Sequence, residues 1–195
     1  MNNLYKMLYT PFQHWLDGKS LWFFSDTHFG DPDCLLMDKT WPSPADQVAI
    51  INEIVPKNAT FVLLGDVGAE AEWVSGIRAQ NKVLVMGNHD VKSVSVWFNE
   101  FYKGPVFISS KILLSHEPIP GLNFCLNIHG HDHDPAHWIN EHGINLAANV
   151  CGYEPMSLQD IIKKGYLDGL DDIHRQTIDL AILKKEEREH GKENQ

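Results

Sequence analysis

Five short apolar runs, each closed by glycine or by a polar side chain, constrain the fold of this chain more than any other feature. They span residues 21–25, 61–64, 83–86, 112–115 and 124–129. Continuous apolar runs of about four to six residues are typical of strands that are buried on both faces. The sequence therefore predicts at least five buried strands.

Helix start signals lie between these runs. Ser43-Pro44 combines a favoured N-cap residue with proline at the first helical position, and Ser157 stands three residues before Asp160 in a similar capping pattern. The other predicted helices span residues 70–79, 94–102 and 171–190. Strands that alternate with helices are typical of a layered α/β domain.

Length, charge and cysteine content narrow the class of protein. The 195 residues suit one domain, which we predict over residues 1–195 with a core at 20–158. The formal net charge of −10 disfavours capture of a long nucleic acid. No apolar run approaches about 18 residues and the N-terminus has no signal-peptide pattern, so neither a membrane span nor secretion is expected. Cys34, Cys125 and Cys151 are too scattered for a disulfide framework, which favours a cytoplasmic protein.

The polar residues that close the apolar runs carry the functional prediction. In α/β folds the ligand site forms beyond the carboxyl ends of the strands. We therefore expect one edge of the molecule to carry Asp26, His28, Asp66, Asn88, His89, His116, His131 and His133. A turn or helix cap explains Asp26-Thr27-His28 or Gly65-Asp66 by itself, but a turn at Gly87-Asn88 does not explain the His and Asp that follow it. Chance turns would rarely place an acid, imidazole or amide after every run.

Seven of these side chains form a donor set that suits metal ions: two carboxylates, four imidazoles and one carboxamide. In an extended segment, His131 and His133 would point to the same side. A mixture of O and N donors without thiolate suits Mn²⁺, Fe²⁺, Zn²⁺, Co²⁺ or Ni²⁺. Seven ligands are too many for one ion and fit two ions about 3.5–4 Å apart that share a carboxylate.

The ordered blocks Asp-x-His, Gly-Asp, Gly-Asn-His-Asp, His and Gly-His-x-His resemble those of the calcineurin-like metallophosphoesterases, from Asp26 to about Leu158. The ending, with Asn149-Val150 and then Pro-Met-Ser-Leu at 155–158, is similar to that of the short bacterial and phage-borne members. The resemblance implies a four-layer α/β/β/α sandwich with two mixed β-sheets. It also implies two divalent ions, with Mn²⁺ preferred and Fe²⁺, Zn²⁺, Ni²⁺ or Co²⁺ as alternatives.

The resemblance also implies a role for each motif residue. The residues of the first ion would be Asp26, His28 and His133, and those of the second would be Asn88, His116 and His131. Asp66 would bridge both ions.

Two further residues are predicted to be catalytic. His89 would face the substrate, and Asp90 would either orient His89 or hold its loop, which we favour. His129 alternates with His131 along the chain and is a weaker candidate for substrate contact. His137 and His142 are predicted to lie in a surface loop.

The predicted activity is hydrolysis of a small phosphoester by in-line attack of a hydroxide that bridges the two ions. The motifs fit a phosphomonoesterase and a phosphodiesterase equally well, and they leave the oligomeric state open. One alternative is a nuclease, which the lack of a Lys and Arg cluster with interleaved aromatic residues disfavours. The other is a non-catalytic interaction scaffold, which is disfavoured because no ligand position is missing.

Overall fold

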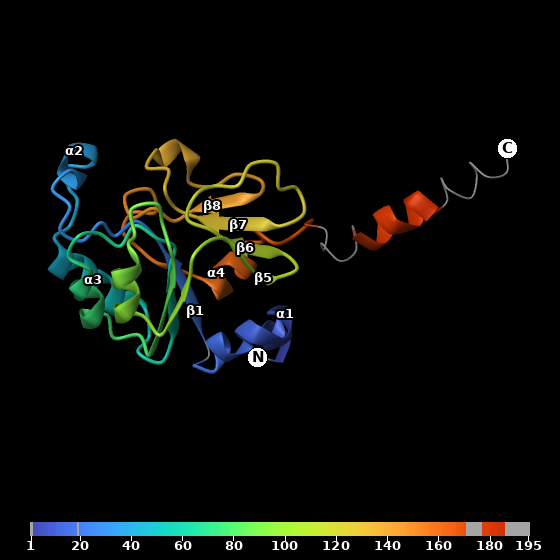
Figure 1. Ribbon diagram of the computed structural model, residues 1–195, viewed down its shortest axis with the longest axis horizontal. Coiled ribbons are helices and arrows are strands. Elements are labelled where there is room, and N and C mark those ends of the chain that lie inside the picture. The colour runs from blue at the N-terminus through green and yellow to red at the C-terminus, as the bar shows by residue number, and fades with distance from the viewer. Residues whose placement is uncertain (1, 19, 171–176, 186–195) are drawn as a thin grey trace.

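The structure, a computed structural model, describes residues 2–18, 20–170 and 177–185. It has a mixed α/β architecture with two β-sheets, one of five strands and one of four (Figure 1). Each sheet contains both parallel and antiparallel strand pairs. The predicted fold class, an α/β protein with two mixed sheets, is therefore confirmed.

The five-stranded sheet has the strand order β4-β3-β2-β1-β9. Its members are β1 (Leu21–Phe24), β2 (Thr60–Leu63), β3 (Asn81–Val85), β4 (Glu100–Tyr102) and β9 (Met156–Ser157). Strands β1 to β4 run parallel and β9 runs antiparallel to β1. All four residues of β2 are buried, as expected of a central strand covered on both faces.

The four-stranded sheet has the order β5-β6-β7-β8. Its members are β5 (Val106–Ser109), β6 (Ile112–Leu114), β7 (Leu126–His129) and β8 (Gly143–Asn145). Strands β6, β7 and β8 run parallel, whereas β5 is antiparallel to β6. A parallel bridge between Ser25 and Ala147 joins the region beyond β1 to the region beyond β8, so the two sheets meet at this edge.

Both predicted capping motifs begin helices. Ser43 accepts a hydrogen bond from the Asp46 backbone N–H at the start of α3 (Pro44–Ile54), and Ser157 accepts one from Asp160 at the start of α4 (Leu158–Lys163). Helix α3 lies on one side of β1, and strands β5 to β8 lie on the other (Figure 1). The shorter helices are α1 (Asn2–Met7), α2 (Cys34–Met37), η1 (Thr10–Leu16), η2 (Ala71–Gly76), η3 (Lys92–Trp97) and η4 (Pro135–His137).

Two of the predicted helices are wrong in type or extent. The segment predicted over 70–79 forms only the 3₁₀ helix η2, which ends where Gly76 approaches the Val48 side chain on α3. The segment predicted over 94–102 divides into η3 and the edge strand β4. The Asn99 backbone N–H donates to the Lys82 carbonyl oxygen, and the Lys82 backbone N–H donates to Asn99 Oδ1. These bonds and the pairing of β4 with β3 draw the second half of the segment into the sheet and outweigh local helix propensity.

The C-terminal helix predicted over 171–190 is described in part. Residues 177–185 are helical, and residues 171–176 and 186–190 lie outside the described residues. In the described parts of the chain, no helix has the length and apolar character needed to cross a membrane. The cysteines Cys34, Cys125 and Cys151 are free and buried.

A half-buried carboxylate joins the N-terminal segment to the edge of the five-stranded sheet. The Glu100 carboxylate on β4 accepts hydrogen bonds from Trp15 Nε1, at 3.2 Å, and from the Tyr102 hydroxyl, at 3.0 Å. His14 Nε2 lies 2.7 Å from the same carboxylate. Burial opposes ionisation of Glu100, but the hydrogen bonds with His14, Trp15 and Tyr102 outweigh it and lower its pKa.

Glu100→Gln is expected to lower the free energy of unfolding at pH 7 by about 1–2 kcal/mol, because hydrogen bonds to a charged acceptor are lost. A carboxyl group whose pKa is depressed by folding stabilises the folded state above its unfolded pKa, about 4.3, and this contribution is lost as the pH falls through the folded pKa. In urea unfolding, the free energy of unfolding of the variant should therefore be lower than that of the wild type at pH 7, and the difference should be much smaller at pH 3.5. Glu53→Gln, on the exposed face of α3, is the control; equal stability of Glu100→Gln and wild type at pH 7 would contradict the assignment.

Candidate metal centre

The carboxyl ends of the parallel strands meet at one edge of the molecule, and the predicted site residues follow them there. Strands β1, β2 and β3 run in the same direction and are followed by Asp26, Asp66 and Asn88. Strands β6 and β7 of the other sheet are also parallel and are followed by His116 and His131. Polar side chains far apart in the sequence are thereby gathered into one site.

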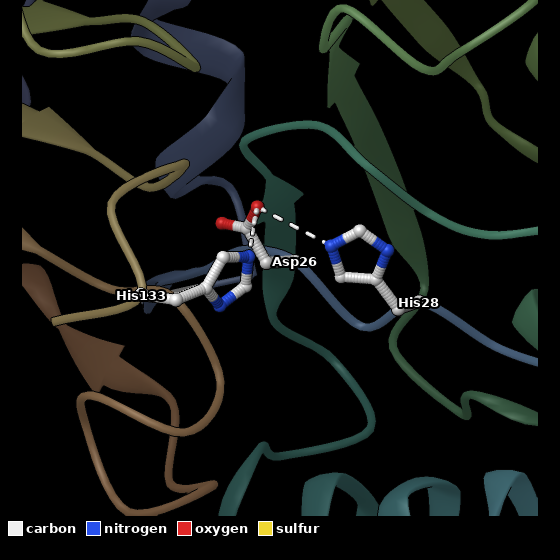
Figure 2. A group of neighbouring side chains, drawn as sticks. All are labelled: Asp26, His28 and His133. Carbon is white, nitrogen blue, oxygen red and sulfur yellow. Dashed lines mark ion pairs between the residues drawn. The ribbon is translucent and has the colours of Figure 1, made fainter. Parts of the chain in front are cut away.

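Asp26, His28 and His133 form the first group with the geometry of a metal site. Asp26 Oδ1 lies 3.8 Å from His28 Nε2 and 3.7 Å from His133 Nε2. Figure 2 shows the Asp26 carboxylate between the two rings, with a nitrogen of each ring turned toward it. Asp26 is fully buried, whereas both imidazoles are partly exposed.

Asp66, His116 and His131 form the second group, and Asn88 joins it. His116 Nε2 lies 3.3 Å from Asp66 Oδ2, 2.8 Å from Asn88 Oδ1 and 3.2 Å from His131 Nδ1. Four atoms with lone pairs, two nitrogens and two oxygens, therefore converge on one small volume.

Asp66 lies between the two groups. Its Oδ2 atom is 4.0 Å from His28 Nε2 in the first group and 3.3 Å from His116 Nε2 in the second. One carboxylate oxygen thus faces ligand atoms of both groups. The structure brings close together all seven side chains that were predicted as metal ligands, with Asp66 facing ligand atoms of both groups.

The backbone is strained at this edge. Asp26, His28, Asp66 and His131 adopt positive φ angles of 56°, 43°, 50° and 68°. Residues with a side chain rarely adopt this left-handed conformation, and such strain concentrates at functional sites. It also corrects one expectation: the backbone at His131 is left-handed and not extended, and His131 and His133 belong to different groups.

Hydrogen bonds orient two of the imidazoles. His116 Nδ1 lies 2.8 Å from the Leu64 carbonyl oxygen, and His133 Nδ1 lies 2.8 Å from Asn149 Oδ1. Both partners accept, which assigns a proton to Nδ1 and leaves Nε2 of each ring directed into the site. Asn149 also donates to the His133 carbonyl oxygen, at 2.9 Å, so it holds both the ring and the backbone of that residue.

Asp31 is a neighbour of the site that the sequence analysis missed. Its Oδ2 atom lies 3.4 Å from His28 Nδ1, on the side of the ring away from Asp26. The sequence did contain a signal for this contact, because an acid three residues after a ligand histidine can reach the second ring nitrogen of that histidine. His28, Asp31 and Cys34 form a third cluster, but burial, with the nearby Asp31 charge, raises the pKa of Cys34 to about 12, so it is a neutral thiol.

Asp90 holds the loops of the site together. Its carboxylate accepts hydrogen bonds from the backbone N–H groups of Asp66 at 3.0 Å, Val67 at 3.0 Å and Gly87 at 2.9 Å. Asp66 Oδ1 in turn accepts one from the His89 backbone N–H, at 3.1 Å. Of the two roles predicted for Asp90, these contacts favour the one in which it holds the loop.

The charges of the site are coupled. Burial opposes the charged form of His116, but its hydrogen bond with Asp66 and the charges of Asp26 and Asp66 raise its pKa to about 9. The same contact, against the effect of burial, lowers the pKa of Asp66. Burial raises the pKa of Asp26 and lowers that of His28.

The residues present fit divalent metal ions. Asp26 Oδ1 and His28 Nε2 are buried and have no hydrogen-bond partner among the described residues. Leaving such atoms unpaired is costly, and a cation between them would satisfy both. Ligand atoms about 2.0–2.2 Å from one ion lie roughly 3–4 Å apart, which agrees with all of the distances given for the two groups except the 2.8 Å between His116 Nε2 and Asn88 Oδ1. Carboxylate, imidazole and amide donors suit borderline divalent ions.

The remaining predicted residues lie around this centre. His89 is exposed, with its ring centroid 6.4 Å from that of His28, and belongs to neither metal group. His129 is buried and lines a different cavity with His142. His137 is exposed and lies 2.7 Å from Asp132 Oδ2, outside both groups. Trp41 is a buried wall of the site, with its ring 6.1 Å from those of His28 and His133.

Comparison with known proteins gives a family and a similar structure. The model of the calcineurin-like phosphoesterase family matches residues 19–182 of the chain. A crystal structure of the protein of unknown function AQ665 from Aquifex aeolicus is similar, with a TM-score of 0.59 and 26% identical residues. That match covers 74% of this chain and 98% of the other. The search of curated proteins found no match.

Proposed function

Because the chain belongs to the calcineurin-like phosphoesterase family, we propose that it is a phosphoesterase whose centre takes two divalent ions. Asp26, His28 and His133 would hold one ion, and Asn88, His116 and His131 the other. Asp66 would bind both ions. The observation that carries this proposal is the position of Asp66 Oδ2, within 4.0 Å of ligand nitrogens in both groups.

The ions, when bound, would lower the pKa of a water molecule towards about 7 and offset negative charge on the phosphate oxygens. Residues of the chain would position the reacting groups and transfer a proton. His89 projects from the loop whose backbone is bonded to Asp66, and it is exposed beside His28. We assign it contact with the phosphate oxygens and delivery of a proton to the leaving oxygen. Asp90 would act on the reaction by positioning the loops of Asp66 and His89.

Mn²⁺ is the proposed ion, as the family resemblance implies, and the mixed O and N donor set suits Fe²⁺, Zn²⁺, Ni²⁺ and Co²⁺ as alternatives. A small phosphoester is the proposed substrate, since a chain with a formal net charge of −10 offers little general attraction for long nucleic acids. A cytoplasmic location is proposed on the three free cysteines.

The test is hydrolysis of p-nitrophenyl phosphate and bis-p-nitrophenyl phosphate by metal-stripped protein with and without added Mn²⁺. We expect turnover only with a divalent ion, and loss of turnover with EDTA. His131→Ala should lower metal-dependent kcat/KM at least about 100-fold, equivalent to about 2.7 kcal/mol of transition-state stabilisation. His14→Ala, which removes the imidazole paired with Glu100 on β4, should stay within about twofold and serves as the control. Turnover without metal, or a fully active His131→Ala, would contradict the proposal.

A further inference from the structure

Two separate grooves reach the candidate metal centre. The first, the Trp97 groove, has a cavity volume of about 490 Å³ and is lined by His28, His89, Asp31, Glu72, Val91 and Trp97 among others. The second, the Lys103 groove, has a volume of about 450 Å³ and is lined by Asn88, His116, Lys103, Gly104, Pro105 and Glu117 among others. The two grooves share no lining residue, and each touches residues of the centre. Both volumes lie within the range of small-molecule pockets.

We propose that the substrate is a phosphodiester, with an uncharged aromatic leaving group in the Trp97 groove and its second ester group in the Lys103 groove. This inference rests on the proposed function and names its substrate class. A phosphomonoester has one organic group and would leave one of the two grooves unused. A diester places one organic group on each side of the phosphorus, which matches a centre flanked by two cavities.

The lining of the Trp97 groove selects the kind of leaving group. Trp97 is 38% exposed and Val91 61% exposed, so an accessible indole ring and an apolar side chain are available to an aromatic ring. Asp31 and Glu72 line the same groove, and none of its described lining residues is Lys or Arg. A phosphate or carboxylate on the leaving group would therefore be repelled, whereas a neutral ring with hydroxyl or amide donors would be accepted.

His89 determines which groove receives the leaving group. Its side chain lines the Trp97 groove, while its neighbour Asn88 lines the Lys103 groove. In the reaction, water adds to phosphorus, the P–O bond to the aryl group breaks, and His89, which lines the groove of the aryl group, gives a proton to the leaving oxygen. The proton lost by the water restores His89, so a diester and water yield a phosphomonoester and a phenol.

Binding of phosphinates, which have P–C bonds and cannot be hydrolysed, tests the two grooves without catalysis. Titration calorimetry would compare diphenylphosphinate, with two aromatic groups, against methyl(phenyl)phosphinate, with one, on the Mn²⁺-loaded protein. We expect diphenylphosphinate to bind at least about tenfold more tightly, a difference of about 1.4 kcal/mol. Equal affinities would overturn the inference.

A variant that fills one groove sharpens the test. Gly104 lines the Lys103 groove, and a Cβ there would meet no atom within 4 Å, so Gly104→Phe introduces a ring at the groove without a clash at its base. This variant should lower the affinity for diphenylphosphinate at least about tenfold and the affinity for methyl(phenyl)phosphinate less than twofold. Trp97→Ala should weaken the binding of both phosphinates by a similar factor, and Trp97→Phe should bind both of them almost as tightly as the wild type. If Gly104→Phe weakens both ligands equally, the second groove does not hold an ester group.

Kinetics separates failure of this inference from failure of the proposed function. Bis-p-nitrophenyl phosphate and methyl p-nitrophenyl phosphate have the same leaving group and differ only in the second ester group. Gly104→Phe should lower kcat/KM for the first by at least about tenfold and leave the second within twofold. If both diesters are hydrolysed with metal and Gly104→Phe changes their kcat/KM equally, this inference is overturned and the proposed function stands. If neither these diesters nor p-nitrophenyl phosphate are hydrolysed with any divalent ion, the proposed function fails and the inference with it.

Discussion

Asp66→Asn is expected to lower kcat/KM for phosphoester hydrolysis at least about 10³-fold, equivalent to about 4 kcal/mol. Asp66 Oδ2 faces His28 Nε2 at 4.0 Å and His116 Nε2 at 3.3 Å, so one substitution weakens both ion sites. Asparagine has nearly the same shape but no charge, and its NH₂ group cannot serve as a metal ligand. The effect therefore reports on the shared ligand and not on lost packing.

Steady-state kinetics at saturating Mn²⁺, together with the Mn²⁺ content of the protein, measures this effect. Asp17→Asn, at the end of η1, is the matched control because it makes the same chemical change away from both metal groups. The control should keep wild-type activity and metal content. An Asp66→Asn variant within tenfold of wild type would show that the carboxylate does not bridge two ions.

Gly87→Ala is expected to have the second largest effect although no ligand is changed. A Cβ at Gly87 would lie 2.2 Å from Asp66 Oδ1 and 2.6 Å from the Asp66 backbone nitrogen, distances that real Cβ atoms do not show. The methyl group must displace the shared carboxylate or the loop that carries it. We expect kcat/KM to fall at least about 100-fold, with a loss of stability of about 1–3 kcal/mol from the forced rearrangement.

Gly104→Ala is the control for this substitution, because a Cβ at Gly104 would meet no atom within 4 Å. Both variants add one methyl group at a glycine that lines the Lys103 groove. Parallel kinetics and thermal unfolding should show Gly104→Ala close to wild type and Gly87→Ala severely impaired in activity. Equal activity of the two variants would contradict the close approach of Gly87 to Asp66.

The central strands were predictable because burial on both faces leaves an unbroken apolar run in the sequence. The run at 61–64, for example, corresponds closely to β2. The short strands β4, β5, β8 and β9 were not predicted. Glu100–Tyr102 and Gly143–Asn145 contain no such run, and they are strands because a neighbouring strand supplies their hydrogen bonds.

The metal ligands were predictable for a related reason. Each follows a buried strand, and parallel strands bring their carboxyl ends to one edge, so order along the chain indicates proximity in space. The contacts around the ligands depend on loop conformation instead. The approach of Asp31 to His28 and the left-handed backbone at His131 are local outcomes that no apolar pattern encodes. The two grooves likewise arise from side chains of several loops.

The count of metal ions bound per chain tests the account most directly. Metal-stripped protein would be equilibrated with excess Mn²⁺, freed of unbound metal by rapid gel filtration, and analysed by inductively coupled plasma mass spectrometry. The two ligand groups joined by Asp66 predict two Mn²⁺ ions per chain in the wild type. A wild-type chain that binds one ion or none, with Mn²⁺ or with any of the other divalent ions named above, would contradict the account.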